Sequence, residues 1–303
     1  MNTDNAKNWG YLLFLSLLWG SSFFFYKILV AVLPPITVVL GRIGIAGIAL
    51  NLWLLAKGER LPRDRATWGR FLWSGLLNNV VPFILIAWGE TRISSGMTSI
   101  LNAMTPIFLV PVAHMMTDDD RITPGKMMAV ILGFIGVAIL VGPDALAGNN
   151  QLLGELAVAM AALTYAFGTV YTRRLRGLTP LVAATGQITG AALMLLPLSL
   201  IIERPWTYPM PSLSVWGAFV AIALANTAYA YFIYYKLLAR TGATFTALCT
   251  FIIPPLAVLM GVLLLHETIA WTALVGMGVI AAGLAVNDGR LIAALRRRPA
   301  TVD

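Results

Sequence analysis

The stretch WGRFLWSGLLNNVVPF (residues 68–83) recurs 148 residues further along the chain as WGAFVAIALANTAYAY (residues 216–231). Both copies are apolar, and the shift places Asn78 on Asn226. The match extends beyond these blocks without a gap, and it aligns Arg92 with Arg240, Thr98 with Thr246 and Pro106 with Pro254. Because the matches fall on Asn, Pro, Arg and Trp as well as on common apolar residues, the chain is predicted to contain two copies of one unit.

The composition is that of a membrane protein. Of the 303 residues, 59% are hydrophobic and 11% are charged, whereas soluble domains carry about 25% charged residues. At about 20 residues per crossing, this length allows roughly ten membrane helices. Lys7 precedes a long apolar run without a cleavage site, which indicates a first membrane helix and not a cleaved signal. The basic residues lie in short turns, so nucleic acid is not an expected partner.

Ten helices are predicted from apolar runs separated by Gly, Pro and charged turns. The predicted fold class is an all-α polytopic membrane protein. The expected helices are 9–32, 36–56, 68–88, 95–115, 124–141, 152–172, 180–202, 214–236, 243–265 and 270–287.

Most of the 21 lysines and arginines fall on the side of the N-terminus if ten helices are assumed. The positive-inside rule then predicts cytoplasmic N- and C-termini in an inner membrane. Five helices per half is an odd number, so the second half enters the membrane from the opposite face. We therefore expect two inverted five-helix repeats, residues 1–146 and 147–303. Inverted repeats are typical of secondary transporters, whose substrate site lies near the midplane between the repeats.

The ends of the two halves carry a family pattern. The first is AMTPIFLVPVAHMMTDDDRITPGKMMAVILGFIGVAIL and the second is FIIPPLAVLMGVLLLHETIAWTALVGMGVIAAGLAV. Each has a fourth-helix proline, an acidic residue in the next turn and a glycine-punctuated fifth helix. This pattern resembles the EamA-type transporters of the drug/metabolite transporter superfamily. The aromatic first and eighth helices look most like the YddG-type amino-acid exporters. Many relatives have a glutamate before the proline of the second half, whereas this chain has Thr105 and Ile253 at the two positions.

Polar side chains inside apolar helices mark the predicted substrate site. They cannot face lipid without losing hydrogen bonds, so they face protein or a wet cavity. Interhelical hydrogen bonding is the alternative role. Aromatic residues with polar tips suit a pocket for a partly apolar solute. The candidate substrate-binding residues are Trp19, Asn78, Asn79, Phe83, Asn102, Thr105, Tyr165, Thr169, Asn226, Thr227, Tyr231 and Thr250.

Three further residues are singled out. Pro106 and Pro254 remove backbone donors at matched positions, which predicts either a gate or a packing kink. Arg42 lies inside a membrane helix, where a charge is costly and rarely idle. It is expected to bind a substrate carboxylate, to pair with a carbonyl, Glu90 or Glu155, or to extend to the surface.

The sequence contains no motif for nucleotide binding, hydrolysis or a metal site, and the two histidines fall on opposite faces. No enzyme activity, cofactor or metal is expected. The predicted function is a secondary transporter that exports amino acids, including aromatic ones, by alternating access and works as a monomer. The alternatives are a drug, cation or nucleotide-sugar transporter, a passive channel, or a membrane-embedded enzyme acting on lipid.

Overall fold

The computed structural model describes residues 3–117, 122–141, 150–246 and 248–288. Within these ranges every regular element is helical and no strand is present. Eight helices are long and apolar enough to cross a membrane, and two shorter apolar helices, Cys249–Leu265 and Trp271–Gly283, complete the predicted ten. The predicted boundary between residues 146 and 147 and the acidic residue Asp119 lie outside the described residues.

The first half begins with α1 (Thr3–Val30) and α2 (Pro35–Ala56). The third span is made of α3 (Arg65–Gly75), η1 (Leu76–Val80) and α4 (Val81–Glu90). The fourth is made of α5 (Ser95–Asn102) and α6 (Thr105–Met116), and the fifth is α7 (Pro124–Val141). In the second half, the sixth span is α8 (Asn150–Thr172) with η3 (Arg173–Leu175), and the seventh is α9 (Pro180–Leu198) with η4 (Ser199–Glu203), followed by η5 (Pro205–Thr207). The eighth span is made of α10 (Leu213–Val220), η6 (Ala221–Tyr229) and α11 (Ala230–Thr246). The ninth is α12 (Cys249–Leu265) and the tenth is α13 (Trp271–Asp288).

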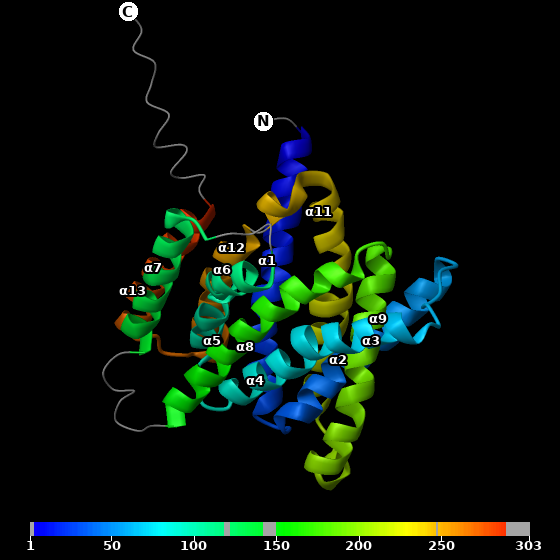
Figure 1. Cartoon of the computed structure of the whole chain (residues 1–303). Helices are drawn as coiled ribbons and strands as arrows, with labels where there is room; N and C mark the ends of the chain where they lie inside the picture. Colours follow the sequence, from blue (N-terminus) through cyan, green and yellow to red (C-terminus); the bar gives the residue numbers. More distant parts are fainter. Residues whose placement is uncertain (1–2, 118–121, 142–149, 247, 289–303) are drawn as a thin grey trace, which may run out of the picture.

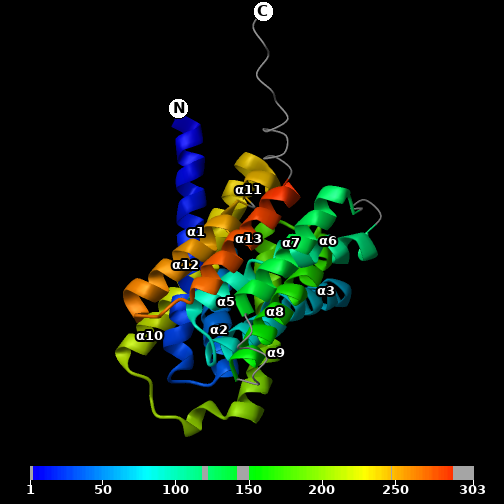
Figure 2. The same ribbon diagram turned by 90° about the vertical axis from the view of Figure 1, so that its left-hand side faces the viewer.

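The helices of the two halves pack in matched pairs. The fifth span, α7, lies along the tenth, α13, and the second, α2, lies along the seventh, α9 (Figures 1 and 2). The contact of α1 with α12 has its counterpart in the contact of α6 with α8. This arrangement is the one expected of two inverted five-helix repeats.

Glycines allow α7 and α13 to approach closely. A Cβ atom added to Gly136 would come within 2.9 Å of the carbonyl oxygen of Gly276, and one added to Gly276 would come within 2.6 Å of the carbonyl oxygen of Gly136. Small residues let membrane helices pack backbone to backbone. The glycine pattern of the fifth and tenth helices therefore serves the contact between the repeats.

Two π-helical segments interrupt the third and eighth spans at matched positions. They are η1 and η6, and they hold the repeated Asn78 and Asn226. A π-turn accommodates an extra residue and changes which side chains share a helix face, and such turns are frequent at functional sites. The sequence analysis predicted ordinary helices here, because one extra residue in an apolar run leaves no visible break in the pattern.

The fourth span is interrupted next to Pro106, one of the two prolines at which the sequence predicts a kink or a gate. α5 ends at Asn102 and α6 begins at Thr105, so the helix is interrupted where Pro106 follows. Proline has no N–H to donate to the carbonyl four residues earlier, which is that of Asn102. The Thr105 hydroxyl donates to this carbonyl instead, with an Oγ1–O distance of 2.8 Å. Pro254 differs from its counterpart, because it lies inside the continuous helix α12.

The predicted start of the ninth helix at residue 243 is also wrong. The preceding helix α11 runs on to Thr246, and α12 begins at Cys249. The segment ARTGATFT contains no proline, and its single glycine is too weak a breaker to end an apolar helix.

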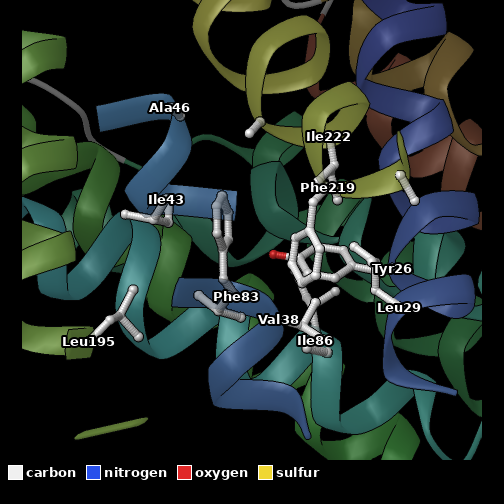
Figure 3. Close-up of a cluster of buried hydrophobic side chains, with 14 of the residues drawn as sticks. Tyr26, Leu29, Val38, Ile43, Ala46, Phe83, Ile86, Leu195, Phe219 and Ile222 are labelled. Atoms are coloured by element: carbon white, nitrogen blue, oxygen red, sulfur yellow. The ribbon is translucent and has the colours of Figure 1, made fainter. Parts of the chain in front are cut away.

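The largest core cluster lies where α1, α2, α4, α9 and η6 meet. Figure 3 shows its side chains, with the Tyr26 hydroxyl directed toward the ring of Phe83. Tyr26 is 1% exposed. A polar group is therefore placed at the centre of an apolar core, and this position coincides with the candidate site.

Candidate functional site

Arg42 is the centre of the candidate site. It lies on α2 with buried neighbours, and only 6% of its surface is exposed. Its guanidinium carbon lies 4.2 Å from the centroid of the Phe83 ring and 5.0 Å from that of Tyr26. Its Nε donates to the Thr227 hydroxyl at 3.0 Å. Residues from the first, second, third and eighth spans thus meet at one cation.

The charge of Arg42 is not neutralised within the described part of the chain. No carboxylate there forms an ion pair with it, and its Nε donates to the uncharged Thr227. Burying an unpaired cation costs several kcal/mol, and contact with an aromatic ring returns only about 0.5–2 kcal/mol. The guanidinium is therefore available to an anionic group that enters the site.

A row of side-chain amides lies beside the cation. The Ser74 hydroxyl donates to Gln187 Oε1 at 2.7 Å, and Gln187 Nε2 donates to Asn79 Oδ1 at 2.7 Å. The Asn79 acceptor is thus occupied. Its buried Nδ2 and the buried Tyr26 hydroxyl make no close hydrogen bond to the described residues, although the Tyr231 hydroxyl lies beside the first and the Arg42 guanidinium beside the second. The groups left open are donors or hydroxyls, so the site is suited to a ligand rich in acceptors.

Aromatic side chains enclose the remaining sides. The Tyr165 ring lies 6.3 Å from that of Phe83 in an edge-to-face arrangement. The Tyr231 hydroxyl lies beside the Asn79 amide. Among the predicted residues, Asn79, Phe83, Tyr165, Thr227 and Tyr231 are therefore brought together with Arg42. Such rings can contact either an apolar side chain or an ammonium group.

A cleft of about 360 Å³ lies at the face on which α2 ends and α9 begins, and it shares Tyr231 with this cluster. Ligand pockets for small molecules start at about 300 Å³. Lys57 and Lys236 lie on its walls, together with Leu50, Ala228 and Tyr231, which also pack in or against the central core. Since α1 also begins on this side, we refer to it as the N-terminal face.

At the opposite face, two carboxylates cap the starts of helices. Glu267 accepts hydrogen bonds from the backbone N–H of Ser95 at 2.9 Å and from its hydroxyl at 2.8 Å. Glu203 accepts from the backbone N–H of Thr37 at 2.6 Å and from its hydroxyl at 2.8 Å. Both bonds tie a turn of the second half to the start of a helix in the first half, where a negative charge is favoured.

Two of the predicted amides serve helix packing instead. Asn226 is buried and its Nδ2 donates to the Ser21 hydroxyl on α1 at 2.9 Å. Asn78 donates to the Thr172 hydroxyl on α8 at 3.3 Å and packs against Gly168. These bonds match the interhelical role weighed as the alternative. Neither contact joins the Arg42 cluster.

The other predicted residues lie apart from Arg42 or contact other elements. Trp19 packs against Tyr234, with ring centroids 5.5 Å apart, in the core between α1 and α11. The exposed Thr169 donates its hydroxyl to the backbone oxygen of Tyr165 at 2.8 Å. Thr250 lies in the first turn of α12, and Asn102 and Thr105 flank the break between α5 and α6.

Sequence reasoning missed two members of the cluster. Tyr26 shares a stripe of α1 with Trp19, but the stripe alone does not reveal which ring reaches the centre. Gln187 is an amide in an otherwise apolar helix, and that feature could have identified it by the argument applied to the asparagines. Among the described residues, no group of three potential metal ligands is present.

Ten apolar spans in two inverted repeats, with a buried cation between the repeats, are the architecture of a membrane transporter. The model of the EamA-like transporter family matches residues 8–142 and 152–287, and the chain belongs to this family.

Two of the three relatives compared below are transporters by name. The chain is 24% identical to the uncharacterized transporter YoaV of Bacillus subtilis over 90% of this chain and 94% of the relative. It is 27% identical to the uncharacterized inner membrane transporter YedA of Escherichia coli over 89% and 87%. It is 25% identical to protein PecM of Dickeya dadantii over 88% of each. A solved crystal structure, 18% identical, matches 97% of this chain and 99% of its own with a TM-score of 0.67, which shows the shared fold.

Proposed function

We propose that this transporter carries amino acids, including aromatic ones, out of the cytoplasm by alternating access. The observation that supports this substrate class is the buried Arg42, which lies between the rings of Phe83 and Tyr26 and forms no ion pair within the described residues. A carboxylate accepts hydrogen bonds from a guanidinium in a bidentate geometry and neutralises its charge. The Asn79 Nδ2 donor supplies a further bond to the same group.

The ammonium group of an amino acid would face the aromatic side of the site. Tyr165 and Tyr231 offer ring faces there, and cation–π contact is worth about 0.5–2 kcal/mol. Because the remaining lining is apolar and aromatic, substrate side chains of different shapes can be accepted. The site would therefore bind amino acids broadly and weakly, as suits a carrier that must release them.

A cationic drug is a poorer candidate. The central charge of the site is positive, and an organic cation would be repelled where a carboxylate is attracted. A nucleotide sugar would bring at least two phosphate charges to a cluster in which the described part of the chain places one buried cation, Arg42. Neither substrate has an observation in its favour.

We further propose that the N-terminal face is cytoplasmic, in line with the basic turns on that side and the positive-inside rule. The cleft would then be open to the cytoplasm, and the carboxylate-capped face would be closed to the outside. The protein would act as a monomer in the inner membrane, because its two units, residues 1–146 and 147–303, together complete one site. Export follows from the resemblance to YddG-type exporters.

A thermal-shift screen tests the substrate class, because only a ligand that binds the folded state raises its melting temperature. The purified protein is heated with amino acids, with the amines formed by removing their carboxyl groups, and with organic cations. We expect stabilisation by amino acids and none by the matching amines. Stabilisation by the amines or by organic cations, but not by amino acids, would overturn the proposed substrate class.

A further inference from the structure

Glu90, the last residue of α4, is a buried acid that the proposed transport site does not use. It is 0% exposed, and neither of its carboxylate oxygens has a hydrogen-bond partner. An ionised carboxylate without water or donors costs several kcal/mol, whereas the neutral acid does not carry this penalty. The environment of Glu90 therefore favours the form that holds a proton.

The nearest charged groups do not supply the missing partner. Lys27 from α1, Arg42 from α2 and Glu267 from the turn before α13 act on the charge of Glu90. The Lys27 ammonium, however, donates to the backbone oxygens of Glu90 and Ile93, each at 2.7 Å. Lys27 is thus held by carbonyls at the end of α4, and the Glu267 carboxylate is held at the start of α5.

The remaining charged groups around α4 are engaged elsewhere. On α8, Glu155 accepts a hydrogen bond from Gln151 at 3.0 Å. On the turn after α4, the Arg92 guanidinium stacks over the Trp88 ring at 3.5 Å. α5 contributes no titratable side chain. The state of Glu90 is therefore set by whether Lys27 and water can reach it.

We propose that Glu90 is the proton-binding site of the transport cycle. It holds a proton while the end of the bundle opposite the N-terminal face is closed, and it releases the proton to the outer medium when that end opens. Opening would draw Lys27 away from the carbonyls and admit water. The carboxyl group would then lose its proton to water and its carboxylate would pair with the Lys27 ammonium. This inference rests on the alternating-access cycle proposed above.

The sign of the pH effect follows from proton binding. The closed end binds one proton more than the open end, so acid stabilises the closed end and rising pH favours opening. For one proton, the ratio of open to closed molecules can change by at most about tenfold per pH unit. The proton is exchanged with the medium, so no further reactant is required.

Opening can be measured with a cysteine in the closed end. In a Cys249→Ala background, Ile93→Cys introduces a thiol where the native side chain is 4% exposed, and Thr91→Cys introduces one at an exposed position in the same turn. Both thiols must ionise before they react with a membrane-impermeant maleimide. Taking the ratio of their alkylation rates removes this shared dependence on pH. We expect this ratio to rise severalfold between about pH 5 and pH 8, and a flat ratio overturns the proposal.

Three variants assign the effect to Glu90. Glu90→Gln imitates the protonated acid, so its ratio should stay low at every pH, whereas Glu90→Asp should restore a rise. Glu155→Gln is the matched control at another buried acid, and it should behave as the parent does. A parent-like rise in Glu90→Gln contradicts the proposal. The assay contains no substrate, so its failure is separate from a failure of amino-acid binding.

Discussion

At the scale of single residues, a buried arginine that forms no ion pair in the described part of the chain distinguishes this site. Apolar helices conceal most side chains from sequence analysis, yet charges and amides within them stand out because lipid cannot satisfy them. The sequence therefore pointed to Arg42 and Asn79. It favoured Asn79 over Asn78 only slightly, because the sequence does not reveal the π-helical turn that decides which face each amide takes. Tyr26 was hidden among other aromatics of the same helix.

The orientation of Asn79 provides a prediction at this scale. Replacing Gln187 with Leu removes the donor that holds Asn79 Oδ1, so the amide can turn and its Nδ2 is no longer fixed toward the site. Loss of a buried hydrogen bond costs about 1–3 kcal/mol, which corresponds to a loss of amino-acid affinity of roughly fivefold to a hundredfold. Isothermal titration or the thermal-shift dose response measures this loss.

Thr189→Val is the matched control. Thr189 lies on the same helix and accepts a bond from Asn51 Nδ2 at 2.8 Å, away from the Arg42 cluster. This variant should lose a similar amount of stability and retain its amino-acid affinity. Equal affinities for the Gln187→Leu and Thr189→Val variants would mean that Gln187 does not position Asn79 for the substrate.

At the scale of elements, the pattern of apolar runs and breakers is sufficient to predict ten helices, because each run must span the membrane. It is insufficient to predict breaks and bulges within a run. The interruption between α5 and α6 depends on how Thr105 compensates for Pro106, and η1 and η6 depend on one extra residue per turn. These features depend on local hydrogen bonding, which apolar periodicity does not record.

The contact of α7 with α13 gives the prediction for this scale. A leucine at Gly276 would drive its Cβ against the Gly136 oxygen and the Leu140 side chain, at 2.6 and 2.7 Å. Overpacking of this kind costs about 1–3 kcal/mol. We expect the melting temperature of the purified protein to fall by several degrees, as followed by its intrinsic tryptophan fluorescence.

Gly278, two residues further along α13, has open space where a Cβ would lie. Gly278→Leu should therefore melt close to the parent temperature. If the leucine variants at Gly276 and Gly278 melt at the same temperature, the close glycine contact does not hold the two repeats together.

At the scale of the whole molecule, the repeat explains how one site can face two sides. Two units of opposite orientation meet at Arg42, with a cleft at the N-terminal face and carboxylate caps at the other. Exchanging the conformations of the two units would close the cleft and open the capped end. The distribution of basic residues, which the sequence displays directly, predicts which of these faces the cytoplasm.

Labelling of single cysteines in intact cells tests this orientation. In the Cys249→Ala background, Met210→Cys lies at an 84% exposed position between η5 and α10, and Arg63→Cys lies between α2 and α3 on the N-terminal face. An impermeant thiol reagent should label the first in intact cells and the second only after the membrane is permeabilised. The reverse pattern would place the N-terminal face outside.

The most direct test of the account is counterflow of labelled amino acids in liposomes that contain the parent protein or Arg42→Gln. Liposomes with the parent protein should take up labelled amino acid in exchange for the unlabelled amino acid inside them. Each exchange requires the carboxylate of an amino acid to bind the Arg42 guanidinium. The Arg42→Gln variant, shown to be folded by its melting curve, should lose at least about tenfold of the rate, as expected when a charged hydrogen-bonding partner worth 1.5–3 kcal/mol is removed. Folded parent protein that exchanges no amino acid, or an Arg42→Gln variant that exchanges at the parent rate, would contradict the central claim.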